Sequence, residues 1–294
     1  MSLRSPSTQK IANFYRYDDG KSLEPSNPVI KRIISKFFTH VTRIATERLG
    51  ADLMSYGTKI GIVTAAGYTE ADKYYARLYG LLEAIKASQL LTPAQKRNLI
   101  IMGGESNFLF IYDPESPYLL THLPRRNWIL PSMSTWTQPT ITTLLDLAEA
   151  SLRECVHNLD LPATILRKER AVGIFPSVPG YHFPRESLEE TVLIVQKKLE
   201  MSEVGKILPF CAFNGGNDVF VDIGDKSWGV LVCQKFFGRG EDGAGDSIMG
   251  ERTLHVGGRH SSLCAYSEPP IFIRQEAASA PGSLVFKEYG ANSF

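Results

Sequence analysis

The chain has 294 residues, of which 43% are hydrophobic, enough for one large α/β domain or for a core domain that carries a smaller inserted one. Its 32 basic and 31 acidic side chains leave a formal net charge of +1, which excludes a global field that draws the protein to nucleic acid or to an anionic membrane. The four cysteines form no CxxC pair, so we exclude a disulfide framework. The sequence has no continuous run of about 18 apolar residues, so we exclude a membrane-spanning helix and expect a cytoplasmic protein.

The first third of the chain is predicted to contain a helix followed by a strand and a second helix. Apolar residues at helical spacing predict a helix over about residues 35–54. The apolar run Lys59–Thr64 is typical of a buried strand. Thr69 and Asp72 then provide an N-cap and a capping-box acid for a helix whose apolar positions extend to Ile85. A loop therefore follows the carboxyl end of this strand.

Strands and helices continue to alternate along the chain. Thr92-Pro93 opens a short helix before a strand at Asn98–Met102. Further strands are predicted at Ala171–Phe175, Ile207–Phe213, Asp218–Ile223 and Thr253–Val256, and further helices at Ile141–Leu159 and Ser187–Met201. The alternation predicts an α/β fold with a doubly wound, mostly parallel sheet. We expect the core to comprise 1–103 and 207–257, a cap to comprise 104–206, and an irregular tail to occupy 258–294, where the periodicity ends.

Two strand ends carry residues suited to phosphate chemistry. Thr64 ends a buried strand and is followed by small residues, which let backbone N–H groups approach an anion. Asp218 and Lys226 flank the strand in DVFVDIGDK, where the lysine can neutralise a phosphoryl group and the aspartate can accept hydrogen bonds from a sugar or a base. The alternatives are a structural threonine and a half-exposed strand with a charged turn.

Six blocks of the sequence together resemble the IMP-specific 5′-nucleotidase family, in the family's order. The blocks are YDDGKSLEPSNPVI, KIGIVTAAGYTEADKYYARLYGLLEAI, IMGGESNFLF, RAVGI, FNGGNDVFVDIGDKSWGV and TLHVG. They cover most of residues 17–257. The resemblance implies hydrolysis of IMP to inosine and phosphate by a Mg²⁺-dependent core of the haloacid dehalogenase (HAD) type with an inserted α/β cap. It also implies a homotetramer and ATP as an allosteric effector.

The resemblance assigns four nucleotide-binding residues to this chain. Thr64 matches the family's phosphate-binding threonine and Lys226 its lysine. Asp19 and Asp218 match carboxylates that contact the nucleotide.

Other family carboxylates have no counterpart at the aligned positions. The family's nucleophile and general acid lie in an Asp-Gly-Asp-x-Thr loop, where this chain has Ile11 and Asn13. A magnesium-binding aspartate follows His-Val-Gly in the family, where this chain has Gly258, and Ser293 stands where a later Gly-Ala-Asn-Asp motif has its aspartate. Mg²⁺ prefers anionic oxygen ligands, which these residues do not supply. We therefore assign no catalytic residue and no metal ligand, and expect this chain to be inactive or severely impaired.

The expected family function is that of an IMP 5′-nucleotidase, and two alternatives stay open. One is a nucleotide-binding homologue without turnover, and the other is a regulatory subunit that assembles with an intact homologue. Residues 1–16, 35–54 and 258–294 depart from the family pattern, whereas the blocks between them stay close to it. We therefore hypothesise that the chain was altered at gene-segment junctions. Mature messenger RNA that carries all three segments at full abundance would contradict this hypothesis.

Overall fold

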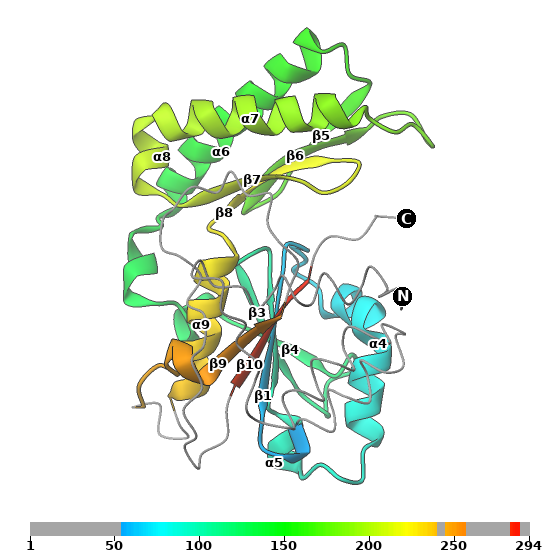
Figure 1. Cartoon of the computed structure of the whole chain (residues 1–294), viewed down its shortest axis with the longest axis vertical. Coiled ribbons are helices and arrows are strands. Elements are labelled where there is room, and N and C mark those ends of the chain that lie inside the picture. Colours follow the sequence, from blue (N-terminus) through cyan, green and yellow to red (C-terminus); the bar gives the residue numbers. More distant parts are fainter. Residues whose placement is uncertain (1–53, 240–244, 257–282, 289–294) are drawn as a thin grey trace, which may run out of the picture.

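Figure 1 shows a computed structural model of the chain, in which two units lie one above the other, each built around a β-sheet. It describes residues 54–239, 245–256 and 283–288. The helix predicted over 35–54 lies outside these ranges except for its last residue. Within them, no helix is long and apolar enough to cross a membrane.

The lower unit is built on a six-stranded sheet with the strand order β4-β3-β2-β1-β10-β9 (Figure 1). Its strands are β1 (Lys59–Thr64), β2 (Leu99–Gly103), β3 (Phe108–Tyr112), β4 (Leu120–Leu123), β9 (Thr253–Val256) and β10 (Ser283–Glu288). Strands β2, β1, β10 and β9 run parallel, whereas β3 and β4 form an antiparallel edge. The strands predicted at 59–64, 98–102 and 253–256 are confirmed to within a residue.

Helices cover both faces of this sheet. On one face, α4 (Ala71–Ala87) buries Tyr74 in a cluster with Ile62 of β1. On the other face, α9 (Lys226–Gly238) packs in a cluster that contains Val63. Successive residues of a strand point to opposite faces, so a strand between two helical layers must be apolar throughout. The predicted α/β fold with helices on both sides of the sheet is confirmed.

The two predicted helix starts differ in outcome. The helix α5 (Pro93–Lys96) begins at Pro93 as predicted, and it also has a capping box that was not predicted, in which Thr92 accepts from the backbone of Gln95 and the Gln95 side chain accepts from the backbone of Thr92. The predicted cap at Thr69 is wrong, because α4 begins one residue later, with Glu70 at the N-cap and no side-chain capping bond.

The upper unit is a four-stranded antiparallel sheet with helices on one face (Figure 1). The strand order is β5-β6-β8-β7. The strands are β5 (Ala163–Arg167), β6 (Ala171–Pro176), β7 (Phe210–Asn214) and β8 (Val219–Ile223). The helices are α6 (Gln138–Asn158), α7 (Arg185–Met201) and α8 (Glu203–Ile207), and the short 3₁₀ helices η1 (Arg125–Asn127) and η2 (Pro131–Thr135) precede α6. A third 3₁₀ helix, η3 (Gly250–Arg252), contacts β9 of the lower sheet. The two long helices predicted in this region are confirmed.

The boundaries predicted for the cap are wrong at both ends. Strands β3 and β4, which fall within 104–206, belong to the lower sheet. Strands β7 and β8, which fall within 207–257, belong to the upper sheet. The reason is pairing: β3 folds back on β2 through a short turn, and β8 completes its hydrogen bonding between β6 and β7.

The tail predicted to be irregular contains a central strand. β10 pairs in parallel with β1 on one side and with β9 on the other. Ser283–Glu288 is a short run that directly follows Ala280-Pro281-Gly282, a segment typical of a loop, so its periodicity did not indicate a strand. The prediction is therefore wrong for residues 283–288, and the rest of the tail lies outside the described residues.

Lys59 links the start of β1 to the end of α9. Its ammonium group donates to the carbonyl of Phe237 at 2.6 Å and lies 5.7 Å from the centre of that ring. A cation at a helix carboxyl end is favourable because it meets unpaired carbonyls and the negative end of the helix dipole. We expect Lys59→Met to lower the free energy of unfolding by about 1–2 kcal/mol. Urea denaturation measures this loss, and the exposed Lys206→Met control should change stability by less than about 0.5 kcal/mol.

Candidate functional site

The loop after β1 is tied to the turn after β2. Thr64 is buried, and its Oγ1 accepts a hydrogen bond from the backbone N–H of Ala66 at 3.1 Å. The backbone N–H of Glu105 donates to the carbonyl of Thr64, and that of Gly104 donates to the carbonyl of Ala66, both at 2.9 Å. The Tyr74 hydroxyl donates to the same Ala66 carbonyl at 2.5 Å. Thr64 is thus held at the carboxyl end of the sheet.

Lys226 begins helix α9 and is directed by the residues around it. Asp225 caps the helix, because its Oδ1 accepts from the backbone N–H of Ser227 at 2.7 Å and of Trp228 at 3.2 Å. The Lys226 ammonium lies 3.6 Å from Glu105 Oε1, and both side chains are buried. A charge is costly to bury unless a partner compensates it, so this ion pair fixes Lys226 above the strand ends.

A glycine lets α9 come close enough for this ion pair to form. A Cβ placed on Gly229 would lie well inside van der Waals distance of the Glu105 carbonyl oxygen and 2.6 Å from Cγ1 of Val63. Asn107 adds a further link, since its Nδ2 donates to the carbonyls of Gly104 at 2.7 Å and Ile223 at 2.6 Å. Thr64 and Lys226, far apart in the sequence, therefore meet through the turn that carries Glu105.

The upper sheet presents carboxylates on the face that its helices leave uncovered. Val219, Val221 and Ile223 pack in the cluster that contains the helices, so the alternating residues Asp218 and Asp222 lie on the opposite face. That face is turned towards the lower unit in Figure 1. Burial, followed by the charge of Glu105, raises the pKa of Asp222 well above its ordinary value, and the charges of Lys168 and Lys226 oppose the rise.

Asp218 shares this face with two aromatic rings and a lysine. Burial raises the pKa of Asp218, whereas Lys168 and the Gly215 backbone lower it. The Lys168 ammonium lies 5.1 Å from the centre of the Phe220 ring, which stacks on Phe213 at 6.4 Å. Aromatic faces and a carboxylate are groups that can stack on a planar base and accept hydrogen bonds from a ribose.

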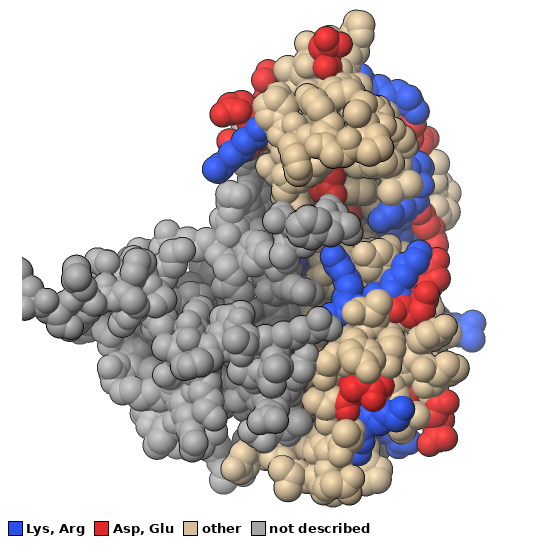
Figure 2. All heavy atoms as spheres, turned by 90° about the vertical axis from the view of Figure 1, so that its right-hand side faces the viewer, with Lys and Arg blue, Asp and Glu red and all other residues tan. Residues whose placement is uncertain are grey.

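Basic side chains also occur at the rim beside the loop after β1. Lys73 and Arg77 on α4 lie 5.7 and 5.6 Å from the centre of the Tyr68 ring. Figure 2 views the molecule from the side of α4 and shows Lys and Arg side chains gathered where the upper and lower parts meet. Such a rim attracts an anion despite the nearly neutral chain.

The predicted site residues have different outcomes. The structure brings Thr64 and Lys226 together, and it places Asp218 at the far end of β8 from Lys226. Asp19 lies outside the described residues. Glu105 and Asp222 were missed as site residues. The available signals were the position of Glu105 directly after a strand-end glycine pair and the alternation of Asp222 with Asp218.

The described residues do not form a magnesium site. Among them, no group of three or more histidine, cysteine, aspartate or glutamate side chains is arranged to hold a metal ion. The positions aligned with family carboxylates, Ile11, Asn13 and Gly258, lie outside the described ranges. Their side chains offer no anionic oxygen, which is the ligand Mg²⁺ prefers. The described residues and these three positions therefore do not fit the metal that the resemblance implies.

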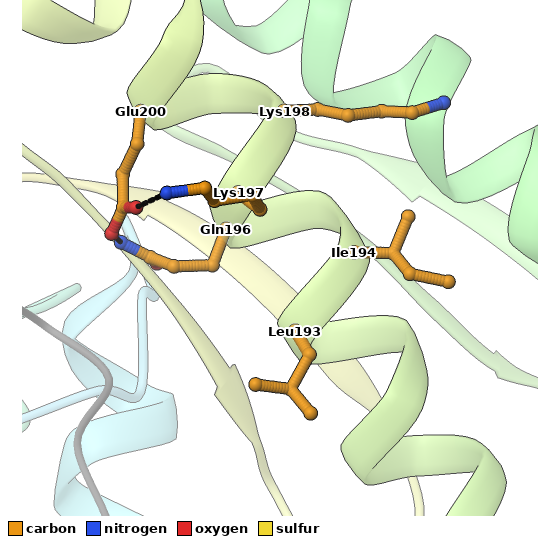
Figure 3. A pocket seen from close by; sticks show the side chains of 6 residues that line it. All are labelled: Leu193, Ile194, Gln196, Lys197, Lys198 and Glu200. Atoms are coloured by element: carbon orange, nitrogen blue, oxygen red, sulfur yellow. Dashed lines mark hydrogen bonds and ion pairs between the residues drawn. The ribbon is translucent and has the colours of Figure 1, made fainter.

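A hollow on the upper unit lies away from these residues. It is lined by Leu193, Ile194, Gln196, Lys197, Lys198 and Glu200, all on α7. In Figure 3, Glu200 interacts with Lys197 and Gln196, while Lys198 points away. Gln196 also accepts from the backbone of Ala212 in β7, so it anchors the helix to the sheet. In Figure 1, α7 lies on the side of the upper sheet that is turned away from the lower unit, and we exclude the hollow on α7 from the candidate site.

Comparison with known sequences points to one family. A family model described as IMP-specific 5′-nucleotidase matches residues 12–267. IMP-specific 5′-nucleotidase 1 of Neurospora crassa is 53% identical over 271 residues, covering 90% of this chain and 59% of that protein. The protein of the same name from Aspergillus fumigatus is 54% identical over 249 residues, covering 85% of this chain and 50% of that protein. The chain thus spans only about half to three fifths of these relatives.

Solved structures give the same picture. The IMP-bound, N-terminally truncated IMP-nucleotidase of Plasmodium falciparum is 31% identical with a TM-score of 0.58, covering 67% of this chain and 51% of that one. The ATP-bound enzyme from the same organism is 32% identical with a TM-score of 0.55, covering 65% of this chain and 44% of that one.

Proposed function

Because this chain belongs to the IMP-specific 5′-nucleotidase family, we propose that it binds IMP with the 5′-phosphate between Thr64 and Lys226. The observation that carries the proposal is the convergence of these two residues on the turn with Glu105. A hydroxyl and a buried ammonium suit phosphoryl oxygens, because charge-assisted hydrogen bonds are the stronger ones. A phosphate that takes the ammonium of Lys226 must compete with Glu105, and this competition favours a highly charged ligand.

The nucleoside part of IMP is assigned to the uncovered face of the upper sheet. Asp218 accepts hydrogen bonds from the ribose or the base, and Phe220 and Phe213 offer aromatic faces. Lys168 keeps positive charge near both Asp218 and Asp222. A ligand that extends from Lys226 to Asp218 would contact both units, so we place the IMP site between them.

The family reaction is hydrolysis of IMP to inosine and phosphate, and it needs carboxylates that this chain lacks at the aligned positions. A nucleophilic carboxylate attacks phosphorus and a second carboxylate protonates the leaving ribose oxygen. Ile11 and Asn13 can do neither. We therefore propose that this chain binds IMP without turning it over.

Two measurements on the purified chain test the proposal. In calorimetric titrations, IMP should bind about 100-fold more tightly than inosine, because the phosphate adds charge-assisted bonds. In an assay with Mg²⁺ and IMP, no phosphate should be released. Equal affinities for IMP and inosine would exclude the phosphate site, and phosphate release would show that another residue serves as nucleophile.

Restoring the missing carboxylates extends the test. The variant Ile11→Asp, Asn13→Asp, Gly258→Asp should gain Mg²⁺-dependent phosphate release from IMP. The matched control changes Ile11 and Gly258 to asparagine and keeps Asn13, which gives the same side-chain sizes without the charge. Activity in the aspartate variant alone would establish an intact binding site that lacks its acids. No phosphate release from either variant would mean that carboxylates at these three positions are not enough to rebuild the catalytic site.

The family membership extends the proposal to assembly, effector and location. We infer a homo-oligomer and a cytoplasmic location, and the buried thiols of Cys155 and Cys233 support a reducing compartment. ATP enters as a candidate effector because an ATP-bound relative from Plasmodium falciparum has a similar structure. Light scattering with and without ATP tests the assembly and its response together.

A further inference from the structure

Two arginines lie where the chain passes between the upper and lower units. Residues 124–137 lead from β4 of the lower sheet to α6 of the upper unit, and residues 224 and 225 lead back from β8 to α9. Arg125 is the first residue of η1, on the first passage. Arg170 lies in the turn between β5 and β6, and its carbonyl accepts from the backbone N–H of Ile223 beside the second passage at 3.0 Å.

Arg125 is held between two indole rings. The centre of its guanidinium lies 5.2 Å from the Trp128 ring and 5.6 Å from the Trp136 ring. Both terminal nitrogens are buried and have no hydrogen-bond partner in the described structure. Burial, followed by the charge of Arg170, lowers the pKa of Arg125 to about 10. The aromatic contacts fix the orientation of the fork but satisfy none of its N–H groups.

Arg170 is also only partly satisfied. Its Nε donates to Glu169 at 3.1 Å, and Glu169 is largely exposed. The Arg170 side chain is 13% exposed, and its Nη1 is buried without a hydrogen-bond partner. The carboxylate that compensates the charge of Arg125 is therefore the exposed Glu169, which also pairs with Arg170.

Ser106 and the Trp136 ring that holds Arg125 both border Gly224, next to the residue that bonds the Arg170 carbonyl. A Cβ placed on Gly224 would lie 3.0 Å from Cη2 of Trp136, the ring that holds Arg125, and would collide with the hydroxyl of Ser106. Ser106 is fully buried, and its hydroxyl likewise has no partner among the described residues. Buried polar groups in native proteins are nearly always hydrogen-bonded, so four unsatisfied atoms in one region indicate a ligand.

We propose that Arg125, Arg170 and Ser106 form a binding site for a tetrahedral oxyanion, a phosphate group, distinct in its residues from the pair Thr64 and Lys226. Two guanidinium groups from different segments and one hydroxyl supply donors to several oxygens at once, which suits four phosphate oxygens better than two carboxylate oxygens. Because Arg125 lies on the passage from the lower sheet and Arg170 on the upper sheet, the bound anion fixes one unit against the other. Anion binding at this site would therefore affect how far the two sheets lie apart.

The test measures phosphate binding after the first site has been removed. In a Lys226→Met background, calorimetry with inorganic phosphate should show one remaining site. Adding Arg170→Gln should weaken that site at least tenfold, whereas adding Arg126→Gln, an exposed arginine in the same turn as Arg125, should leave it unchanged. No binding in the Lys226→Met background, or equal binding after Arg170→Gln, would overturn the proposal.

Two additions keep the test decisive. If Arg170→Gln fails to fold, as judged by circular dichroism, Arg125→Lys replaces it: this variant keeps the charge but loses the fork, and it should still weaken phosphate binding severalfold. Unchanged binding in Arg125→Lys would count against the site. Inorganic tripolyphosphate distinguishes the source of the ligand, because tighter binding than phosphate indicates the phosphate tail of a nucleotide and equal or weaker binding indicates free phosphate.

Discussion

Replacing Lys226 with methionine is expected to weaken IMP binding by roughly 100-fold, a loss of about 3 kcal/mol. Methionine keeps most of the aliphatic length of lysine, so the change removes the charge with little change in packing. Two effects act in the same direction. The phosphate loses its buried cation, and the Glu105 carboxylate, 3.6 Å from the ammonium in the parent protein, now repels it.

The same reasoning predicts how the loss can be reversed. Adding Glu105→Gln to Lys226→Met removes the repelling carboxylate, so the double variant should bind IMP more tightly than Lys226→Met alone. Such non-additivity is expected of residues in direct contact. The control is Lys235→Met on the same helix, whose ammonium contacts the carbonyl of Gly245. Its affinity for IMP should match that of the parent protein.

Calorimetric titration with IMP and with inosine measures both effects. Inosine carries no phosphate, so its affinity should be the same in the parent and in Lys226→Met. A parallel loss for both ligands would mean that the substitution disrupts the whole site and that Lys226 has no specific role towards the phosphate. An unchanged affinity for IMP would exclude Lys226 from the phosphate site altogether.

Local patterns in the sequence predict the long elements of this fold but not all of its strands. The strand at Lys59–Thr64 is predictable because it is a continuous apolar run, and helix α6 because its apolar residues follow the helical period. Strands β3 and β5 were not predicted, although β3 is as apolar as the confirmed β2. β10 escapes because its strand character depends on the neighbours β1 and β9, and pairing with distant strands cannot be seen in a local window.

The candidate site divides in the same way. Thr64 and Lys226 are predictable because each follows a strand end, where the chain itself provides the context. Glu105 becomes a site residue only through its ion pair with Lys226, a contact made by the packing of α9 on the sheet. Arg170 opens the RAVGI block, but neither this block nor the sequence around Arg125 predicts a shared role for the two arginines, since their common surroundings arise from the turn at Arg170 meeting the end of β8.

Replacing Gly229 with alanine is expected to lower the free energy of unfolding by about 2–3 kcal/mol and to weaken IMP binding about tenfold. In a helix on its own, this change would be favourable by about 0.5–1 kcal/mol, because alanine loses less conformational freedom on folding. The added methyl group has no room, however, since it would meet the carbonyl oxygen of Glu105 and a methyl group of Val63. The obstacle on one side is backbone, which cannot rotate away as a flexible side chain does.

The sign of the stability change therefore decides whether close packing of α9 builds the site. If α9 must retreat from the sheet, Lys226 retreats with it, and stability and IMP affinity fall together. Urea denaturation and calorimetry measure the two quantities. Gly180→Ala is the control, because its Cβ would meet nothing within 4 Å; its positive φ of 74° should cost about 1–2 kcal/mol, with no change in IMP affinity. A Gly229→Ala protein as stable as its parent would show that the helix and sheet adjust freely, and that the ion pair of Lys226 and Glu105 does not depend on this contact.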